Sequence, residues 1–179
     1  RGGYNMLDQS LWNKCIAFHG HSCPGLAIGY RASVLALEQL GVQSAQDEEL
    51  VCITENDACG VDGVQAVTGC TGGEGNLLFH NTGKMAFSFY SRTTGKNLRL
   101  VLRTLPEMDR EARKDFILNA PAEQIFQVKE TVLPLPEKAR HFQNVTCTRC
   151  GESIPEHKAR LQDGQVLCLD CFSDYSRGW

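Results

Sequence analysis

The 179-residue sequence lacks the features that would direct it to a membrane or to nucleic acid. No apolar run reaches the roughly 18 residues that a membrane span needs. There is no basic excess, because 18 lysines and arginines stand against 21 aspartates and glutamates. The first ten residues, RGGYNMLDQS, have no apolar stretch typical of a signal peptide. We therefore expect a cytoplasmic protein with no general affinity for membranes or nucleic acids.

Cysteine is absent between Cys70 and Cys147, although the chain has nine cysteines in all. They form an N-terminal group and a C-terminal group, which are Cys15, Cys23, Cys52, Cys59 and Cys70, and Cys147, Cys150, Cys168 and Cys171. An odd number of cysteines favours metal binding or thiol chemistry over a disulfide framework. The gap between the groups predicts two separate sites.

The C-terminal group has the spacing of a structural zinc site. Its two C-x2-C pairs are separated by 17 residues, and the pairs are Cys147 with Cys150 and Cys168 with Cys171. Two such turns bring four thiolates to one cation. A hairpin can turn at Asp163-Gly164 between the pairs, and CLDCFSDYS would begin a helix, which is the layout of a treble-clef finger. A redox dithiol pair and free surface thiols are the alternatives, and the spacing favours zinc.

The charges of this tail are balanced. From Glu137 to Trp179 there are six basic and six acidic residues. Such a finger has little electrostatic attraction for phosphates. We therefore expect it to contact a protein partner or to stabilise the fold, and we disfavour a nucleic-acid partner.

The segment FHGHSCPG, residues 18–25, predicts a second centre. His19, His21 and Cys23 alternate, and alternate side chains share a side only in extended backbone. The glycines and the proline of this segment argue against continuous helix, so the three donors can converge. Imidazole and thiolate together suit zinc, nickel, copper or iron. Cys23 also precedes a predicted helix, whose free amides would favour its thiolate.

A second polar segment, ENDACGVD at residues 55–62, follows a short strand-like run. Asp57, Cys59 and Asp62 could supply further ligands or a general base, and Cys70 could face the same pocket. In the alternative interpretation, the histidines satisfy backbone groups at a helix end and the cysteines pack as small apolar side chains. Cys15 and Cys52 fall on apolar stripes and are assigned to the core.

Hydrophobic periodicity predicts an α+β core whose N-terminal helices pack on an antiparallel sheet, followed by a small treble-clef zinc finger. Helices are expected at residues 7–18, 24–40, 61–69 and 106–120, and strands at 50–54, 76–80, 84–92, 97–103 and 126–133. The second to fourth strands are joined by turns that carry Asn or Gly and should form an antiparallel meander. PLPEKARHFQN has the composition of a linker. The predicted domains are a core at residues 1–136 and a zinc finger at 137–179.

The helix at residues 24–40 is unusually thin, because small residues recur along it. It can therefore approach another element closely, at the centre of the fold or at a dimer contact. We predict a homodimer on this ground and from the hairpin edges.

Three motifs in order carry a resemblance: FHGHSCPGLAIGYRA, ENDACGVDGVQAVTGCTGGEGNLLF and GKMAFSFYSRTTGK. From about residue 8 to 135 the sequence resembles the FmdE family, named for the E component of formylmethanofuran dehydrogenase. The tail resembles the auxiliary treble-clef finger of some members. The resemblance implies an α+β core, an intertwined dimer and a metal-binding active site. By motif, that site falls on His19, His21, Cys23 and Cys59, and we add Asp57 as a candidate catalytic residue.

The leading hypothesis is an FmdE-like metal-binding protein associated with molybdenum or tungsten formylmethanofuran dehydrogenase metabolism. It would hold structural zinc in the tail and a second transition metal of unknown identity in the core. The tail spacing suits one zinc, and no ferredoxin-type cysteine run is present to carry electrons. Whether the chain is an enzyme, as a component or a relative of the dehydrogenase, stays open. A metal sensor or regulator that acts through the finger, and thiol redox chemistry at Cys23 and Cys59, are the alternatives.

Overall fold

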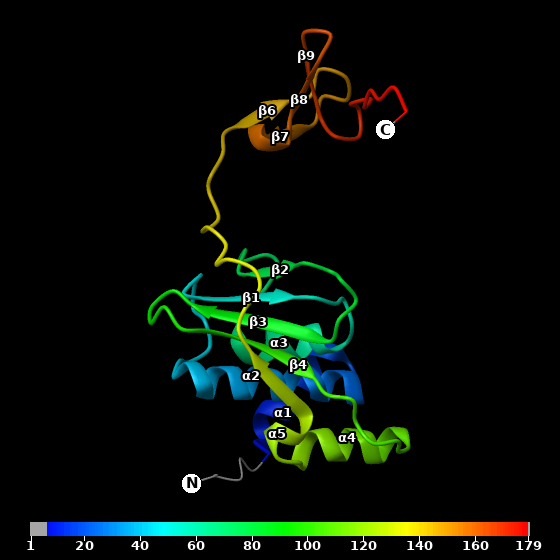
Figure 1. Cartoon of the computed structure of the whole chain (residues 1–179). Helices are drawn as coiled ribbons and strands as arrows, with labels where there is room; N and C mark the ends of the chain where they lie inside the picture. Colours follow the sequence, from blue (N-terminus) through cyan, green and yellow to red (C-terminus); the bar gives the residue numbers. More distant parts are fainter. Residues whose placement is uncertain (1–6, 179) are drawn as a thin grey trace. The chain divides into compact units, whose positions relative to one another are not determined.

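The computed structural model describes residues 7–178, and the chain divides into two compact units between Lys138 and Ala139. Figure 1 shows the helices and the larger sheet in the first unit, and short strands in the second. No helix in the described part of the chain is both long enough and apolar enough to cross a membrane.

The helices of the first unit begin and end at capping residues. They are α1 (Gln9–His19), α2 (Pro24–Leu40), α3 (Gly60–Thr68), α4 (Arg110–Asn119) and α5 (Ala122–Ile125). The carboxylate of Asp8 accepts a hydrogen bond from the Leu11 N–H at the start of α1. Gly20 ends α1 with a left-handed φ of 98°. Pro24 opens α2 and Gly41 closes it, as the sequence predicts.

Five strands form the sheet of this unit, in the order β2-β1-β3-β4-β5. They are β1 (Leu50–Thr54), β2 (Leu77–Phe79), β3 (Ala86–Ser91), β4 (Asn97–Leu102) and β5 (Phe126–Lys129). β3 pairs antiparallel with both β1 and β4, and β5 pairs antiparallel with β4. The expected α+β architecture is confirmed.

The predicted three-strand meander is wrong in its first member. β2 pairs with β1, in parallel, and β1 separates it from β3. Parallel neighbours need a crossover connection, usually a helix, and α3 with the loop after it supplies one. The Asn81–Gly83 turn therefore leads the chain past β1 instead of closing a hairpin.

The sheet is covered differently on its two faces. Helices cover one face (Figure 1), where alternate strand residues such as Cys52, Phe87 and Leu100 join the main core. On the other face Val51, Ile53 and Tyr90 form a smaller cluster that packs against Leu133. The Tyr90 hydroxyl donates a hydrogen bond to the Leu133 carbonyl at 2.6 Å. The run predicted as one strand at 126–133 is therefore a strand only to Lys129, and the segment after it crosses this face of the sheet to reach Tyr90.

α2 and α3 cross with their backbones in contact. A Cβ added to Gly29 would lie 1.8 Å from the Gly60 carbonyl oxygen, and one added to Gly63 would lie 2.7 Å from the Tyr30 nitrogen. The small residues of α2 therefore allow close helix packing at the centre of the fold, which is one of the two locations predicted for such a contact. The homodimer stays a prediction.

A buried ion pair ties the end of β1 to β4. The Nε of Arg99 donates to Oε1 of Glu55 at 2.6 Å, and a second guanidinium nitrogen donates to Oε2 at 3.0 Å. The side chains are only 9% and 4% exposed respectively. The hydrogen bond from Arg99 holds the pKa of Glu55 below its usual value. The pair should therefore fix the loop that leads from β1 to α3.

Replacing Glu55 with glutamine should lower the free energy of unfolding at neutral pH by about 3 kcal/mol, since Arg99 is left buried without its charge partner. Because the folded-state pKa of Glu55 is lowered, its contribution is complete above the unfolded-state value of 4.5 and is lost as the pH falls through the folded-state pKa. The difference in unfolding free energy between wild type and Glu55→Gln should therefore shrink as the pH falls below 4.5. Urea unfolding, followed by circular dichroism at several pH values, measures this difference. Glu111→Gln breaks an exposed pair with Lys114 and should change little. A difference that is constant with pH would contradict this account.

The second unit consists of two hairpins and a short 3-10 helix. The elements are β6 (Asn144–Thr146), β7 (Ser153–Pro155), η1 (Glu156–Lys158), β8 (Arg160–Gln162) and β9 (Gln165–Leu167). The predicted turn between β8 and β9 is confirmed, with φ of 51° at Asp163 and 75° at Gly164. The predicted helix after Cys168 is wrong: only a turn stands there within the described residues, up to 178. The polar segment after Phe172 has no apolar stripe to hold a helix in place.

Candidate metal centres

The four tail cysteines converge in the second unit. Their sulfur atoms all lie within 4.8 Å of one another, and the group comprises Cys147, Cys150, Cys168 and Cys171. Gly151, at φ 77°, allows the first turn, where its N–H donates to the Cys147 carbonyl at 2.9 Å. The Cys150 and Cys168 sulfurs are 3.9 Å apart. Tetrahedral zinc with Zn–S bonds of about 2.3 Å separates its sulfurs by about 3.8 Å. The group therefore fits zinc.

The protonation of these thiols also suits a cation. Backbone amides, first that of Cys150 and then that of Cys168, lower the pKa of Cys147 to about 6. Hydrogen bonding to the Cys168 sulfur raises the pKa of Cys171 to about 12. One thiol of the group is thus ready to ionise while its crowded neighbour keeps a proton. When a divalent metal binds, it replaces the protons on the four thiols and is coordinated by their thiolates.

The predicted core donors meet where α1 gives way to α2. His19 is the last residue of α1, and the left-handed Gly20 turns the chain so that Cys23 caps α2. One ligand atom from each of His19, His21 and Cys23 lies within 4.8 Å of the others. The Nε2 of His19 is 3.7 Å from the Cys23 sulfur, and the two imidazole centroids are 4.5 Å apart. The predicted convergence is present, but not through the predicted extended segment: His19 is helical, the left-handed Gly20 turns the chain, and Cys23 is extended.

The core group has a buried side and an open side. The side chain of His19 is 11% exposed and Cys23 is 3% exposed, whereas His21 is exposed. The Leu26 N–H donates to the Cys23 sulfur at 3.3 Å, which is the predicted contact with a free amide of the helix start. Two inner donors are therefore held in place, and a third faces solvent.

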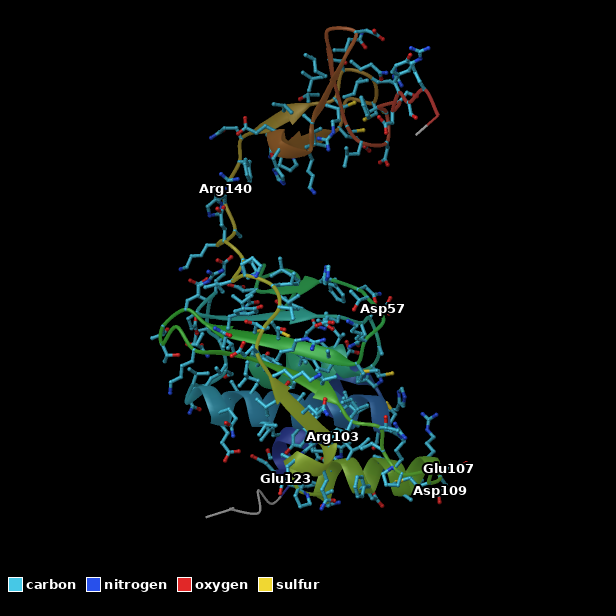
Figure 2. The ribbon with its side chains drawn as sticks, in the orientation of Figure 1. Asp57, Arg103, Glu107, Asp109, Glu123 and Arg140 are labelled. Atoms are coloured by element: carbon cyan, nitrogen blue, oxygen red, sulfur yellow. The ribbon has the colours of Figure 1, made fainter. Side chains whose placement is uncertain are left out.

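Of the predicted site residues in the second segment, Cys59 lies beside Cys23, and neither Cys59 nor Asp57 is among the three donors that converge. Cys59 occupies the N-cap position of α3, and its side chain makes no capping hydrogen bond. Its sulfur and that of Cys23 lie 3.6 and 3.9 Å from the point where Gly25 would carry a Cβ. Partial burial and then the neighbouring Cys23 raise the pKa of the Cys59 thiol. Asp57 is exposed beyond the end of β1 (Figure 2) and is not among the converging donors.

Cys70 does not face this pocket, so that expectation is wrong. It is fully buried, and its thiol donates to the Leu50 carbonyl at 3.4 Å. Leu50 begins β1 whereas the polar segment follows the end of β1, and α3 carries the chain back across that length. Cys15 and Cys52 are both fully buried, as predicted.

Asp62 has a role that its residue type alone did not reveal. Its Oδ2 lies 2.7 Å from the Nδ1 of His19, and its Oδ1 accepts a hydrogen bond from Gln65 at 3.3 Å. The sequence identified Asp62 as a ligand or a base. Its position three residues after Cys59, at the N-cap of α3, was the only local signal, and an acidic residue in a first helical turn is common without any partner.

The core donors fit a transition metal. Imidazole nitrogen and thiolate sulfur are the ligands that zinc and its neighbours prefer. The Nε2 of His19, a ring nitrogen of His21 and the sulfur of Cys23 would hold the ion. Cys59 lies next to Cys23 but outside this group of three ligand atoms.

Comparison with known families matches both units. A family model described as "FmdE, Molybdenum formylmethanofuran dehydrogenase operon" covers residues 18–139. A second model, "Prokaryotic dksA/traR C4-type zinc finger", covers residues 141–177 and therefore all four tail cysteines.

Two individual proteins are similar over most of the chain. One, from Archaeoglobus fulgidus, is named a probable S-adenosyl-L-methionine-binding protein and is 32% identical over 192 residues. The match covers 88% of this chain and 51% of that relative, so the chain spans about half of its length. The other is the crystal structure of a tungsten formylmethanofuran dehydrogenase FmdE-like protein from Syntrophus aciditrophicus. It is 26% identical, with a TM-score of 0.71, and 96% of each chain is covered.

Proposed function

Because the chain belongs to the FmdE family, we propose that it is a metal-binding protein of the molybdenum or tungsten formylmethanofuran dehydrogenase system. Both the family description and the name of the solved relative refer to that system. The observation that carries the proposal is the convergence of His19, His21 and Cys23 within 4.8 Å. The core centre would hold a transition metal, and the tail would hold structural zinc.

The surroundings of the core centre suggest a working role. A bound transition metal supplies a Lewis-acid centre. His19 and Cys23 hold the inner side, where burial keeps competing water away. Exposed His21 and Cys59 border the open side, from which a small molecule can approach. A structural site closes all four positions with buried protein ligands, whereas a working site keeps an open one.

Elemental analysis of the purified chain should find two metal ions per chain. Cys23→Ser and His21→Ala should each remove one ion, because the core centre loses a donor while the tail keeps its four sulfurs. Cys171→Ser should remove only the tail zinc. His80→Ala, which deletes an exposed imidazole outside both groups, is the matched control and should leave both ions in place. A single equivalent in the wild type, lost only with Cys171, would rule out the core centre.

A regulator that acts through the finger is the second candidate. Up to residue 178, the finger presents three large apolar side chains that are exposed, with Leu161 74%, Leu169 49% and Tyr175 82% exposed. Together with the balanced charge, these favour a protein partner over nucleic acid. When variants of this chain replace the wild-type chain in cells that lack it, the metalloprotein proposal requires loss of function with Cys23→Ser. The regulator proposal instead requires loss with Leu161→Ser and retention with Cys23→Ser.

A further inference from the structure

The core centre includes a carboxylate that touches a donor without joining the converging group. Asp62 lies on α3, His19 ends α1 and Cys23 caps α2, so three helices meet at this point. The Nδ1 of His19 faces Asp62 at 2.7 Å, while its Nε2 faces the Cys23 sulfur at 3.7 Å. The two nitrogens of one ring therefore have different partners.

The chemistry of these partners decides which nitrogen carries the proton. An ionised carboxylate can only accept a hydrogen bond, so Nδ1 of His19 must donate to Asp62. In an imidazole that carries one proton, protonation at Nδ1 leaves the lone pair on Nε2, which is the nitrogen that faces the Cys23 sulfur. A metal ligand has to present such a lone pair, and a carboxylate on the far nitrogen is a frequent means of fixing it.

We propose that Asp62 is a positioning residue that fixes the tautomer and ring orientation of His19 so that Nε2 faces the metal. This inference rests on the proposed core centre and assigns one role within it. Gln65 extends the chain of contacts, since it donates to the second oxygen of Asp62 at 3.3 Å. The carboxylate is thereby held from both sides, by α1 through His19 and by its own helix through Gln65.

The glycine crossing supports the same assignment. Gly60 and Gly63 flank Asp62 in sequence, and both lie against the backbone of α2. This contact fixes the position of Asp62 along α2 relative to Cys23, which begins that helix. The Asp62 side chain is 36% exposed while that of His19 is 11% exposed. The carboxylate is therefore partly hydrated, while the imidazole that it contacts lies inside.

Two measurements on the whole chain, with its finger loaded with zinc, test the proposal. With the core free of metal, ¹⁵N NMR of the His19 ring should show Nδ1 protonated in wild type. Asp62→Asn should shift that pattern, because an amide can donate to Nδ1. Titration of the core with Co²⁺ against a competing chelator should show 10- to 100-fold weaker binding by Asp62→Asn. Gln65→Ala should act in the same direction with a smaller change.

Asp115→Asn, the same chemical change at an exposed position of α4, is the control and should alter neither measurement. Thermal unfolding of each variant separates this role from a purely structural one. If Asp62 only held α1 and α3 together, its replacement would lower the melting temperature without changing the ¹⁵N pattern of the ring. An unchanged tautomer, or Co²⁺ affinity equal to wild type, would overturn the proposal. If wild type binds no Co²⁺ in its core, the proposed metal function fails, and the ¹⁵N measurement still decides whether Asp62 sets the ring.

Discussion

Replacing Gly29 with alanine should destabilise the core unit by about 3 kcal/mol or more, at the upper end for an overpacked interior. The new Cβ would lie 1.8 Å from the Gly60 carbonyl oxygen, and 2.5 Å from its carbonyl carbon. Both obstructing atoms are backbone, so no side chain can rotate aside and the two helices must separate. Because α3 carries Asp62 and starts at Cys59, the separation should also weaken metal binding in the core.

Urea unfolding at neutral pH measures the stability effect, and Co²⁺ titration measures the effect on the centre. Gly72→Ala is the matched control, since a Cβ there meets nothing within 4 Å. It should change the free energy of unfolding by no more than about 0.5 kcal/mol, as an ordinary surface substitution does. Wild-type stability in Gly29→Ala would show that the two backbones are not in contact.

Removing zinc from the finger should unfold the second unit and leave the first folded. The apolar core of the finger is small: within its described residues only Leu167, Cys147 and Cys168 are fully buried, with Ile154 and Phe172 packed beside them. So few buried side chains cannot offset the conformational entropy of about 40 residues. Zinc binding to such peptides contributes about 10–16 kcal/mol, which becomes folding free energy.

Amide hydrogen exchange on the whole chain resolves the two units. With a strong chelator, or in Cys168→Ser, amides of β6 to β9 should lose protection while those of β1 to β5 keep theirs. The separate cores of the two units are the reason for expecting independent behaviour. Cys15→Ala, which deletes a thiol outside both metal groups, controls for the loss of a cysteine. Protection that survives zinc removal would contradict a metal-dependent finger.

The parts of the fold that could be predicted were those fixed by local chemistry. Pro24 begins α2 because proline lacks a backbone N–H and is tolerated only in the first turn of a helix. Gly41 ends α2 because it adopts the left-handed conformation that terminates a helix. A C-x2-C turn is a local structure that brings the two sulfurs of each tail pair together, and the four-cysteine zinc spacing predicted that the two pairs would meet. His19, His21 and Cys23 converge as predicted, but through the end of α1 and the left-handed turn at Gly20, and not through the extended alternation on which the prediction was based.

What could not be predicted depended on contacts distant in sequence. The turn after β2 suits a hairpin, yet a strand with two potential neighbours pairs according to the packing of α3, which no local pattern encodes. Cys70 and Cys59 both flank α3, and only the direction of that helix decides which one faces the histidines. The role of Asp62 likewise depends on a contact 43 positions away, with His19.

The backbone contact between α2 and α3 also gives a criterion for transferring this site to other sequences. A histidine–cysteine signature can persist in a homologue whose residues at the positions of Gly29, Gly60 and Gly63 are larger. Such a chain would have to splay its two helices, because those positions meet backbone at 1.8 to 3.3 Å here. The residues that match Cys59 and Asp62, beside and on α3, would then move away from the histidines and Cys23 at the α1–α2 junction. Assignment by the signature alone would overcount chains that keep this arrangement.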